Sequence, residues 1–299
     1  MNPIPQIVLD EPALAWKVAV GCLGLDPRSP QAQDAAETVR RAPLVTALLD
    51  GRDRSGHAYK KWNGSHWTLA LLADLGYPPG EAALLPLLEE TLSTWLGAAH
   101  QEHIRLIAGR TRRCASQEGN ALWAALRLGF TDPRLEELAA RLMRWQWADG
   151  GWNCDKRPQA HTSSFMETLI PLRALALYAR HSGDPAAAKA AERAAGVFLQ
   201  RGMFRRLRDG AVMDPHFLRL GYPAYWHYHV LAGLAVMAEA GFLAHPGCAE
   251  ALDLLEGKRL ADGGFPAEES FARPTRPELS GYSPVRWGVQ GARRSNPFV

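Results

Sequence analysis

Four groups of polar and aromatic residues are the part of this chain that could do chemistry. Each group stands where an apolar helix is expected to begin. Their residue types suit two kinds of chemistry: acid–base catalysis on an apolar molecule, and zinc binding by thiolates and imidazoles. The groups are Lys61, Trp62, His66 and Trp67; Cys114, Glu118, Asn120 and Trp123; Trp152, Cys154, Asp155, His161, Ser164 and Glu167; and Tyr225, Trp226, His227, Tyr228 and His229.

Acid–base catalysis would use the titratable members of these groups. Asp155 or Glu167 is the candidate acid, and His161 or His227 is the candidate base. Aromatic and amide side chains beside them would shape a pocket for an apolar or cationic guest, because an aromatic ring face attracts positive charge. The candidate binding residues are Trp67, Asn120, Trp123, Trp152, Ser164, Tyr225, Trp226 and Tyr228. The alternative for Trp152, as for Trp145 and Trp147, is a structural staple between neighbouring outer helices.

Zinc is the one candidate cofactor. Cys114 and Cys154 begin neighbouring repeats, and His161, His227 or Asp155 would complete a ligand set. The same two cysteines could instead form a buried pair, a reversible disulfide or a single reactive thiol. We expect Cys22 and Cys248 to fill the core, and the histidines outside the four groups, which include His100, to lie in loops or on the surface.

Helices that alternate in character must position these groups. In the outer type, apolar residues recur every three or four positions with charges between them, as after Asp132-Pro133. In the inner type, as in 165–179, the helix is apolar nearly all round. The pattern predicts inner helices near 64–76, 116–129, 162–181 and 222–241, and outer helices near 81–98, 133–147, 185–201 and 246–260.

The repeat extends toward both ends of the chain. Helices near 11–24 and 31–49 would form a first pair, and 282–292 a last inner helix. No segment alternates with period two long enough to predict a strand. We therefore expect an all-α protein, an alpha/alpha toroid in which a ring of inner helices lies within a ring of outer helices, as a single domain over 1–299. The amino-terminal ends of the inner helices would then converge on one mouth.

Several motifs resemble known families. The run Arg141 to Trp152 (RLMRWQWADGGW) looks like the QW repeat of squalene-hopene cyclases, and the hairpin repeat is similar to that of protein prenyltransferase beta subunits. A narrower resemblance is to short bacterial squalene-cyclase-like proteins. It rests on Arg113-Cys114, Glu118-Gly119-Asn120, Gly151 to Cys154 (GWNC), His161 to Phe165 (HTSSF), Pro223 to Tyr228 (PAYWHY) and Arg286-Trp287.

The resemblance implies a terpenoid-cyclase-like enzyme, a cyclase, isomerase or lyase acting on an apolar, isoprenoid-like substrate. The sequence departs from both families at their chemical groups. It has no Asp-x-Asp-Asp run for proton-initiated cyclisation, and Ala160 and Thr162 stand where prenyltransferases carry zinc ligands. Lanthionine cyclases, which are also toroids, hold zinc with two cysteines and a histidine. A displaced zinc site in a prenyltransferase-type or lanthionine-cyclase-type enzyme therefore stays open beside the cyclase.

Composition narrows the remaining classes. A net charge of +3 is too mild to indicate nucleic-acid binding, so we expect Arg105, Arg110, Arg112 and Arg113 to form a solvated loop. The amino-terminal residues lack the features of a signal peptide, and no apolar run is long enough to span a bilayer, which predicts a cytoplasmic protein. Beside the enzyme, a second class stays open: a non-catalytic toroid that binds an apolar ligand, a partner protein or a second copy.

Overall fold

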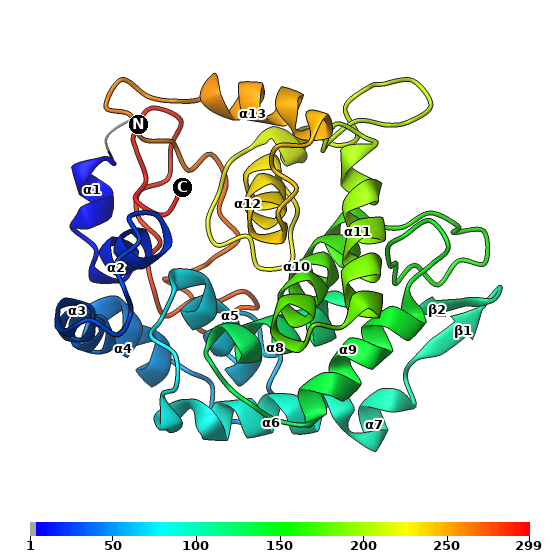
Figure 1. Ribbon diagram of the computed structural model, residues 1–299, viewed down its shortest axis with the longest axis horizontal. Coiled ribbons are helices and arrows are strands. Elements are labelled where there is room, and N and C mark those ends of the chain that lie inside the picture. Colours follow the sequence, from blue (N-terminus) through cyan, green and yellow to red (C-terminus); the bar gives the residue numbers. More distant parts are fainter. Residues whose placement is uncertain (1–3) are drawn as a thin grey trace.

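Helical hairpins follow one another around a ring in the computed structural model, which describes residues 4–299 (Figure 1). One helix of each hairpin lies toward the centre of the ring. These inner helices are α2 (Pro12–Gly21), α5 (Ser65–Leu75), α8 (Ser116–Arg127), α10 (Phe165–Ser182) and α12 (Val230–Ala240). Each inner helix contacts the next along the chain. The chain is therefore the all-α toroid that the alternating pattern predicts.

The other helix of each hairpin packs on the outside of its inner partner. The outer helices are α3 (Pro30–Arg40), followed by the short α4 (Pro43–Asp50), then α6 (Leu85–Leu96), α9 (Arg134–Trp145), α11 (Pro185–Leu199) and α13 (Ala249–Glu256). Single 3-10 turns, η1 (Ala82–Leu84) and η3 (Pro246–Cys248), lead into α6 and α13. The shorter elements are α1 (Gln6–Leu9), α7 (Ala98–Gln101) and η2 (Pro215–Leu218). No described helix is long and apolar enough to cross a bilayer.

Local sequence signals account for where these helices begin and end. Asp184 accepts a hydrogen bond from the Ala186 amide at 2.8 Å, and Pro185 takes the first position of α11, where its missing N–H costs nothing. At the other end, α5, α10 and α12 stop at Gly76, Gly183 and Gly241, each in the left-handed conformation that glycine adopts without strain. Each of these glycines thus ends an inner helix at the turn toward the next outer helix.

Burial follows the predicted distinction between inner and outer helices. All but one of the residues of α5 are buried, whereas α9 buries one face and leaves Glu136 and Glu137 outside. The exception is α12, whose Ala235, Ala238 and Glu239 are exposed. Figure 1 shows why: the carboxyl-terminal end of the chain, rather than a further hairpin, lies between α12 and α2. The ring is thus closed by an irregular segment.

That closing segment corrects one prediction. Residues 282–292, expected to form a last inner helix, contain no helix. Pro284 and the left-handed Gly288 interrupt the backbone, and the segment is instead tied down by isolated bridges such as Ala267 to Gln290. A second correction concerns α12, which begins at Val230 instead of near 222. Tyr225 has φ +51°, which an α-helix does not accommodate, so residues 222–229 form a loop. His229, the last residue of this loop, caps the start of α12.

A short hairpin of strands corrects the expectation that no strand is present. β1 (Arg105–Ile107) pairs antiparallel with β2 (Arg110–Arg112) across a turn at Ala108 and Gly109. This is the basic segment expected to be a solvated loop. Arg105 and Arg110 are at least partly exposed, but Arg112 is buried, lies 4.6 Å from the ring centroid of Trp147 and donates to the Ala160 carbonyl at 2.9 Å. The expected 31–49 helix is also divided, at Pro43, into α3 and α4.

The glycine turn after α9 gives a test of this packing. Gly150 has φ +101°, and a Cβ there would lie 2.4 Å from the Arg193 carbonyl oxygen of α11. We expect Gly150→Ala to lower the free energy of unfolding by about 3 kcal/mol, because backbone strain and a backbone clash add. Gly183→Ala is the matched control. Its φ is +73° but no atom lies within 4 Å, so a loss of only about 1 kcal/mol is expected from urea titrations. Equal losses in both variants would contradict the close approach.

Candidate active site in the central cavity

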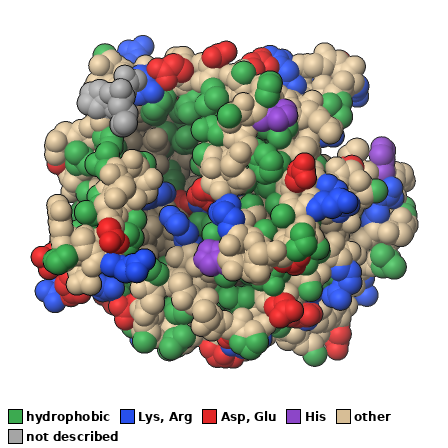
Figure 2. All heavy atoms as spheres, viewed as in Figure 1, with side chains coloured by type: hydrophobic (Ala, Val, Ile, Leu, Met, Phe, Trp, Pro, Cys, Tyr) green, Lys and Arg blue, Asp and Glu red, His purple; other side chains and the backbone are tan. Residues whose placement is uncertain are grey.

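A cavity of about 210 Å³ lies at the centre of the ring. Figure 2 shows the hollow on the face viewed in Figure 1, with acidic and basic side chains at its centre and apolar ones around it. Every inner helix contributes to its wall, together with the 221–229 loop and the carboxyl terminus. Its lining side chains include Lys17, Trp67, Asp74, Asn120, Trp123, Arg173, Tyr225, Trp226, His227, His229, Ala232 and Glu239.

Aromatic rings form one part of the wall. Tyr225 stacks on Trp62 with ring centroids 3.9 Å apart, and Trp67 meets both rings edge-on. The loop conformation described above is what brings Tyr225 and Trp226 to this place. The sequence analysis named both residues as pocket residues, although it placed them on the helix itself. The result is an aromatic, largely apolar part of the cavity wall.

Charged side chains from three inner helices form another part. Arg173 of α10 donates to both oxygens of Glu239 on α12, each at 2.6 Å, and to Asp74 on α5 at 2.8 Å. Its guanidinium also lies 3.6 Å from the ring centroid of Trp123 on α8. Burial would raise the pKa of Asp74, but Arg173 and Lys17 outweigh it and lower that pKa to about 2. Burial would also raise the pKa of Glu239, but the charge and the hydrogen bonds of Arg173 outweigh this effect, and the pKa is lowered. Both carboxyls are therefore ionised at neutral pH.

Two neutral histidines also line the cavity. Burial lowers the pKa of His227 and of His229 to about 4. The Nδ1 of His227 lies 3.1 Å from the Ala224 carbonyl, so that nitrogen carries the proton and Nε2 keeps its lone pair. The Nδ1 of His229 accepts from the Ala232 amide at 3.3 Å, which leaves the proton on Nε2, and this buried atom has no partner among the described residues. One imidazole can accept a proton and the other can donate a hydrogen bond.

The structure brings together half of the predicted catalytic and binding residues in the cavity. His227 lines the cavity with Trp67, Asn120, Trp123, Tyr225 and Trp226. The others do not line it. Asp155 and His161 belong to residues 153–164, which form a loop between α9 and α10. Hydrogen bonds from Arg157 lower the pKa of Asp155 to about 2, and His161 is exposed, with Nδ1 2.8 Å from the Gln159 carbonyl. Neither is a candidate catalyst in this cavity, which corrects the expectation of one shared site.

The remaining predicted binding residues have structural surroundings. Trp152 is buried and donates from Nε1 to the Leu142 carbonyl of α9 at 2.9 Å, so its ring packs against the helix that precedes it in the chain. Tyr228 is buried against Phe165, Phe198 and Phe217. Ser164 stands before α10 and makes no capping hydrogen bond with its side chain. None of these three lines the cavity.

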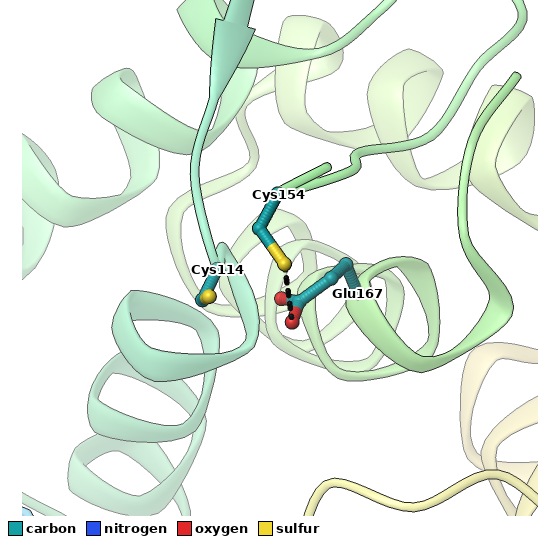
Figure 3. A group of neighbouring side chains, drawn as sticks. All are labelled: Cys114, Cys154 and Glu167. Atoms are coloured by element: carbon teal, nitrogen blue, oxygen red, sulfur yellow. Dashed lines mark hydrogen bonds between the residues drawn. The ribbon is translucent and has the colours of Figure 1, made fainter. Parts of the chain in front are cut away.

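A second cluster holds the predicted acid Glu167 and the predicted thiols (Figure 3). Cys114 precedes α8, Cys154 lies in the loop after α9, and Glu167 is in the first turn of α10. One ligand atom from each lies within 4.8 Å of the others. The two cysteines are thus neighbours, as the sequence predicts, whereas His161 and His227 are not part of the cluster. Burial raises the pKa of Glu167.

Beside this cluster lies a buried ion pair that includes a residue expected on the surface. Arg113 donates from Nε to Glu118 at 2.8 Å, and the same oxygen lies 3.0 Å from Nε2 of His100. Glu118 is fully buried, and His100 is largely covered. Cys248 fills the core as expected, but Cys22 is exposed. The prediction was therefore wrong for His100 and Cys22.

The charged residues of the cavity were not among the residues predicted from the sequence. The predicted residues stand at the amino-terminal ends of the inner helices, whereas Asp74 and Glu239 lie near the carboxyl-terminal ends of α5 and α12. A signal was present: Arg173 is the one charged residue of the apolar stretch 169–179 in α10, where a charge is tolerated only with partners. Such a residue predicts acidic groups on the neighbouring inner helices.

Comparisons with known proteins found no matching family model and no matching curated protein. Among solved structures, the unsaturated glucuronyl hydrolase responsible for the degradation of glycosaminoglycan, from Bacillus sp. GL1, is similar. It has 14% sequence identity, a TM-score of 0.45, and coverage of 91% of this chain and 81% of that chain. A UGL structure with dGlcA-Glc-Rha-Glc is also similar, with 14% identity, a TM-score of 0.40, and coverage of 82% and 69%. Neither structure is a squalene cyclase or a prenyltransferase.

The buried histidines predict how stability depends on pH. His66, His227 and His229 have folded-state pKa values of about 3, 4 and 4, all lowered by burial from the ordinary value of 6.5. Between pH 6.5 and 4 the unfolded chain binds protons that the folded chain does not, so stability falls as pH falls. Each histidine contributes up to about 1.4 kcal/mol per pH unit in this window.

Urea titrations at pH 7.5 and pH 5 would measure this dependence. We expect His229→Gln to flatten the loss of stability between the two pH values. His161→Gln is the matched control, because His161 is exposed and should leave the slope as it is. An unchanged slope in the His229 variant would show that this imidazole titrates alike in both states.

Proposed function

We propose that this protein is an enzyme that binds a small, largely apolar molecule in its central cavity and shifts a proton on it, as an isomerase or lyase. The observation that carries the proposal is the cavity itself, in which aromatic rings, ionised groups and two neutral histidines converge from every inner helix. Such a convergence of polar groups in an apolar pocket is the usual form of a small-molecule site. The resemblance to squalene cyclases supports an isoprenoid-like substrate.

Base chemistry suits the cavity better than acid-initiated cyclisation. A cyclisation begun by protonation needs a carboxylic acid that stays protonated, but Asp74 and Glu239 are both ionised by Arg173. The carboxyl group whose pKa is raised, that of Glu167, does not line the cavity. We therefore assign no cyclase role to these acids, and we assign proton transfer to the histidines.

In the proposed mechanism His227 is the base. Its Nε2 takes a proton from a carbon next to an unsaturated or carbonyl group of the substrate, and the electron pair moves into that group. The Nε2–H of His229 would stabilise the negative charge that develops. Return of the proton from His227 to another carbon completes an isomerisation, and expulsion of a leaving group instead completes an elimination. The ion pairs of Arg173 hold the walls at a fixed separation.

The second candidate is a toroid that binds the same class of molecule without converting it. The low pKa of His227, about 4, favours this candidate because it makes the imidazole a weak base. The two candidates share the binding site and differ in proton exchange. The following two experiments therefore test binding and catalysis separately.

Binding is tested by filling the cavity. Ala232 of α12 lines it, whereas Ala238, on the same helix, is exposed and does not. We expect Ala232→Phe to weaken binding of farnesol at least about tenfold, measured by quenching of tryptophan fluorescence, because the added ring takes the ligand's volume. Ala238→Phe should bind as the wild type does. If both variants bind equally well, the ligand does not lie in this cavity.

Catalysis is tested by proton exchange. The wild type is incubated in D₂O with farnesal, whose γ carbons (the CH2 and CH3 groups on the β carbon of the conjugated aldehyde) carry acidic protons, and with any molecule extracted from the purified protein. We expect deuterium to enter the substrate, measured by mass spectrometry, and His227→Gln to slow this exchange about a hundredfold while farnesol binding is kept. If no bound molecule exchanges protons faster than it does in solvent alone, the protein binds its ligand without converting it, and the proposal of an enzyme is wrong.

A further inference from the structure

The cluster of Cys114, Cys154 and Glu167 does not belong to the cavity, and the proposed reaction makes no use of it. Its three side chains come from three separate elements, and the ligand atoms all lie within 4.8 Å of one another (Figure 3). All three residues are at least partly covered, and both cysteines are free. This arrangement would allow one ligand atom from each of the three residues to bind the same ion.

The carboxylate is held in place for such a role. One oxygen, Oε2, accepts from the Ser116 amide at 3.1 Å, which fixes the side chain against the start of α8. The other, Oε1, is 3.7 Å from the Sγ of Cys154. The hydrogen bond from α8 is the kind of second contact that orients a ligating carboxylate. Figure 3 shows the Sγ of Cys154 directed at this carboxylate, with Cys114 beside them.

We infer that Cys114, Cys154 and Glu167 bind a zinc ion. Two thiolates and one carboxylate are ligands that zinc takes at about 2.0–2.3 Å, and three protein ligands leave a fourth position for water or another small ligand. Two thiolates and a carboxylate carry −3, and a zinc ion of +2 would offset most of this charge. The three ligands would lose their protons as the ion binds.

Neither a disulfide nor a buried thiol pair accounts for the whole arrangement. A disulfide would use the two sulfurs and give the oriented carboxylate no role. An inert thiol pair would be expected among apolar side chains, yet a largely buried carboxyl group meets these sulfurs. The ligand set also differs from the prenyltransferase pattern, whose positions here hold Ala160 and Thr162 and cannot bind zinc.

Metal content tests the site directly, and independently of any activity. The full-length protein is purified under reducing conditions without added zinc, and zinc is measured by mass spectrometry. We expect about one zinc per chain in the wild type, as for a three-ligand protein site. Cys154→Ser and Glu167→Gln should bind zinc at least about tenfold more weakly in competition with a chromophoric chelator. Cys22→Ser, which changes an exposed free cysteine, is the matched control and should match the wild type.

Cobalt substitution identifies the ligands even if a variant folds poorly. The wild type with Co²⁺ in place of zinc should show a thiolate-to-cobalt charge-transfer absorption in the near ultraviolet, since two sulfurs would bind the ion. The site would be overturned if the protein held less than about a tenth of a zinc per chain and its cobalt form lacked this absorption. It would also be overturned if Cys114 and Cys154 formed a disulfide in freshly reduced and desalted protein. Farnesol binding in the Cys154 variant separates this result from the cavity, because loss of zinc should leave it unchanged.

Discussion

The ion pairs of Arg173 are the constraint on which the ring depends. This one guanidinium joins α10 to α12 through Glu239 and to α5 through Asp74, and it packs on Trp123 of α8. The three charged side chains are 16, 37 and 25% exposed, so the contribution of each pair to stability is moderated by solvent. Their larger effect is geometric. A largely buried charge requires its partners, and these partners lie on helices that are far apart in sequence but must meet for Arg173 to be satisfied.

This constraint also explains why a cavity exists at all. Inner helices with only apolar side chains could move together until the centre filled. The carboxylates of Asp74 and Glu239 must instead stay at hydrogen-bonding distance from one arginine. In another part of the wall, the packed rings of Trp62, Trp67 and Tyr225 occupy the space that would otherwise let the helices approach. The cavity thus has a wall that is polar in one part and aromatic in another. A molecule that fits both would have an apolar body and at least one polar group, which is the class of substrate proposed above.

Local signals in the sequence were enough to predict the helices and their alternation. Gly183 marks the end of α10, and Asp184-Pro185 marks the beginning of α11. These signals are local because capping and left-handed turns involve only neighbouring residues. The 222–229 loop could not be predicted in this way. Its Tyr225 takes a left-handed conformation and stacks on Trp62, a residue more than 160 positions away, so the interaction that accompanies the break is not local. The same holds for the closing segment, which forms isolated bridges with residues 266–273 instead of a helix.

The candidate sites divide along the same line. Cys114 and Cys154 could be predicted as neighbours because each stands before the start of an inner helix, and adjacent inner helices begin side by side. Glu167 also stands at such a start, but the sequence analysis treated it as an acid for catalysis, since nothing in the sequence alone says that its carboxylate faces the two sulfurs. Asp155 and His161 failed for the opposite reason. They are close in sequence to residues at the ring, but they belong to a loop that does not line the cavity, and Asp155, which is partly buried, forms its own ion pair with Arg157. The first turn of α10 therefore fixes the direction of Glu167, whereas in the loop beyond Cys154 local contacts such as the ion pair of Asp155 with Arg157 decide where a side chain points.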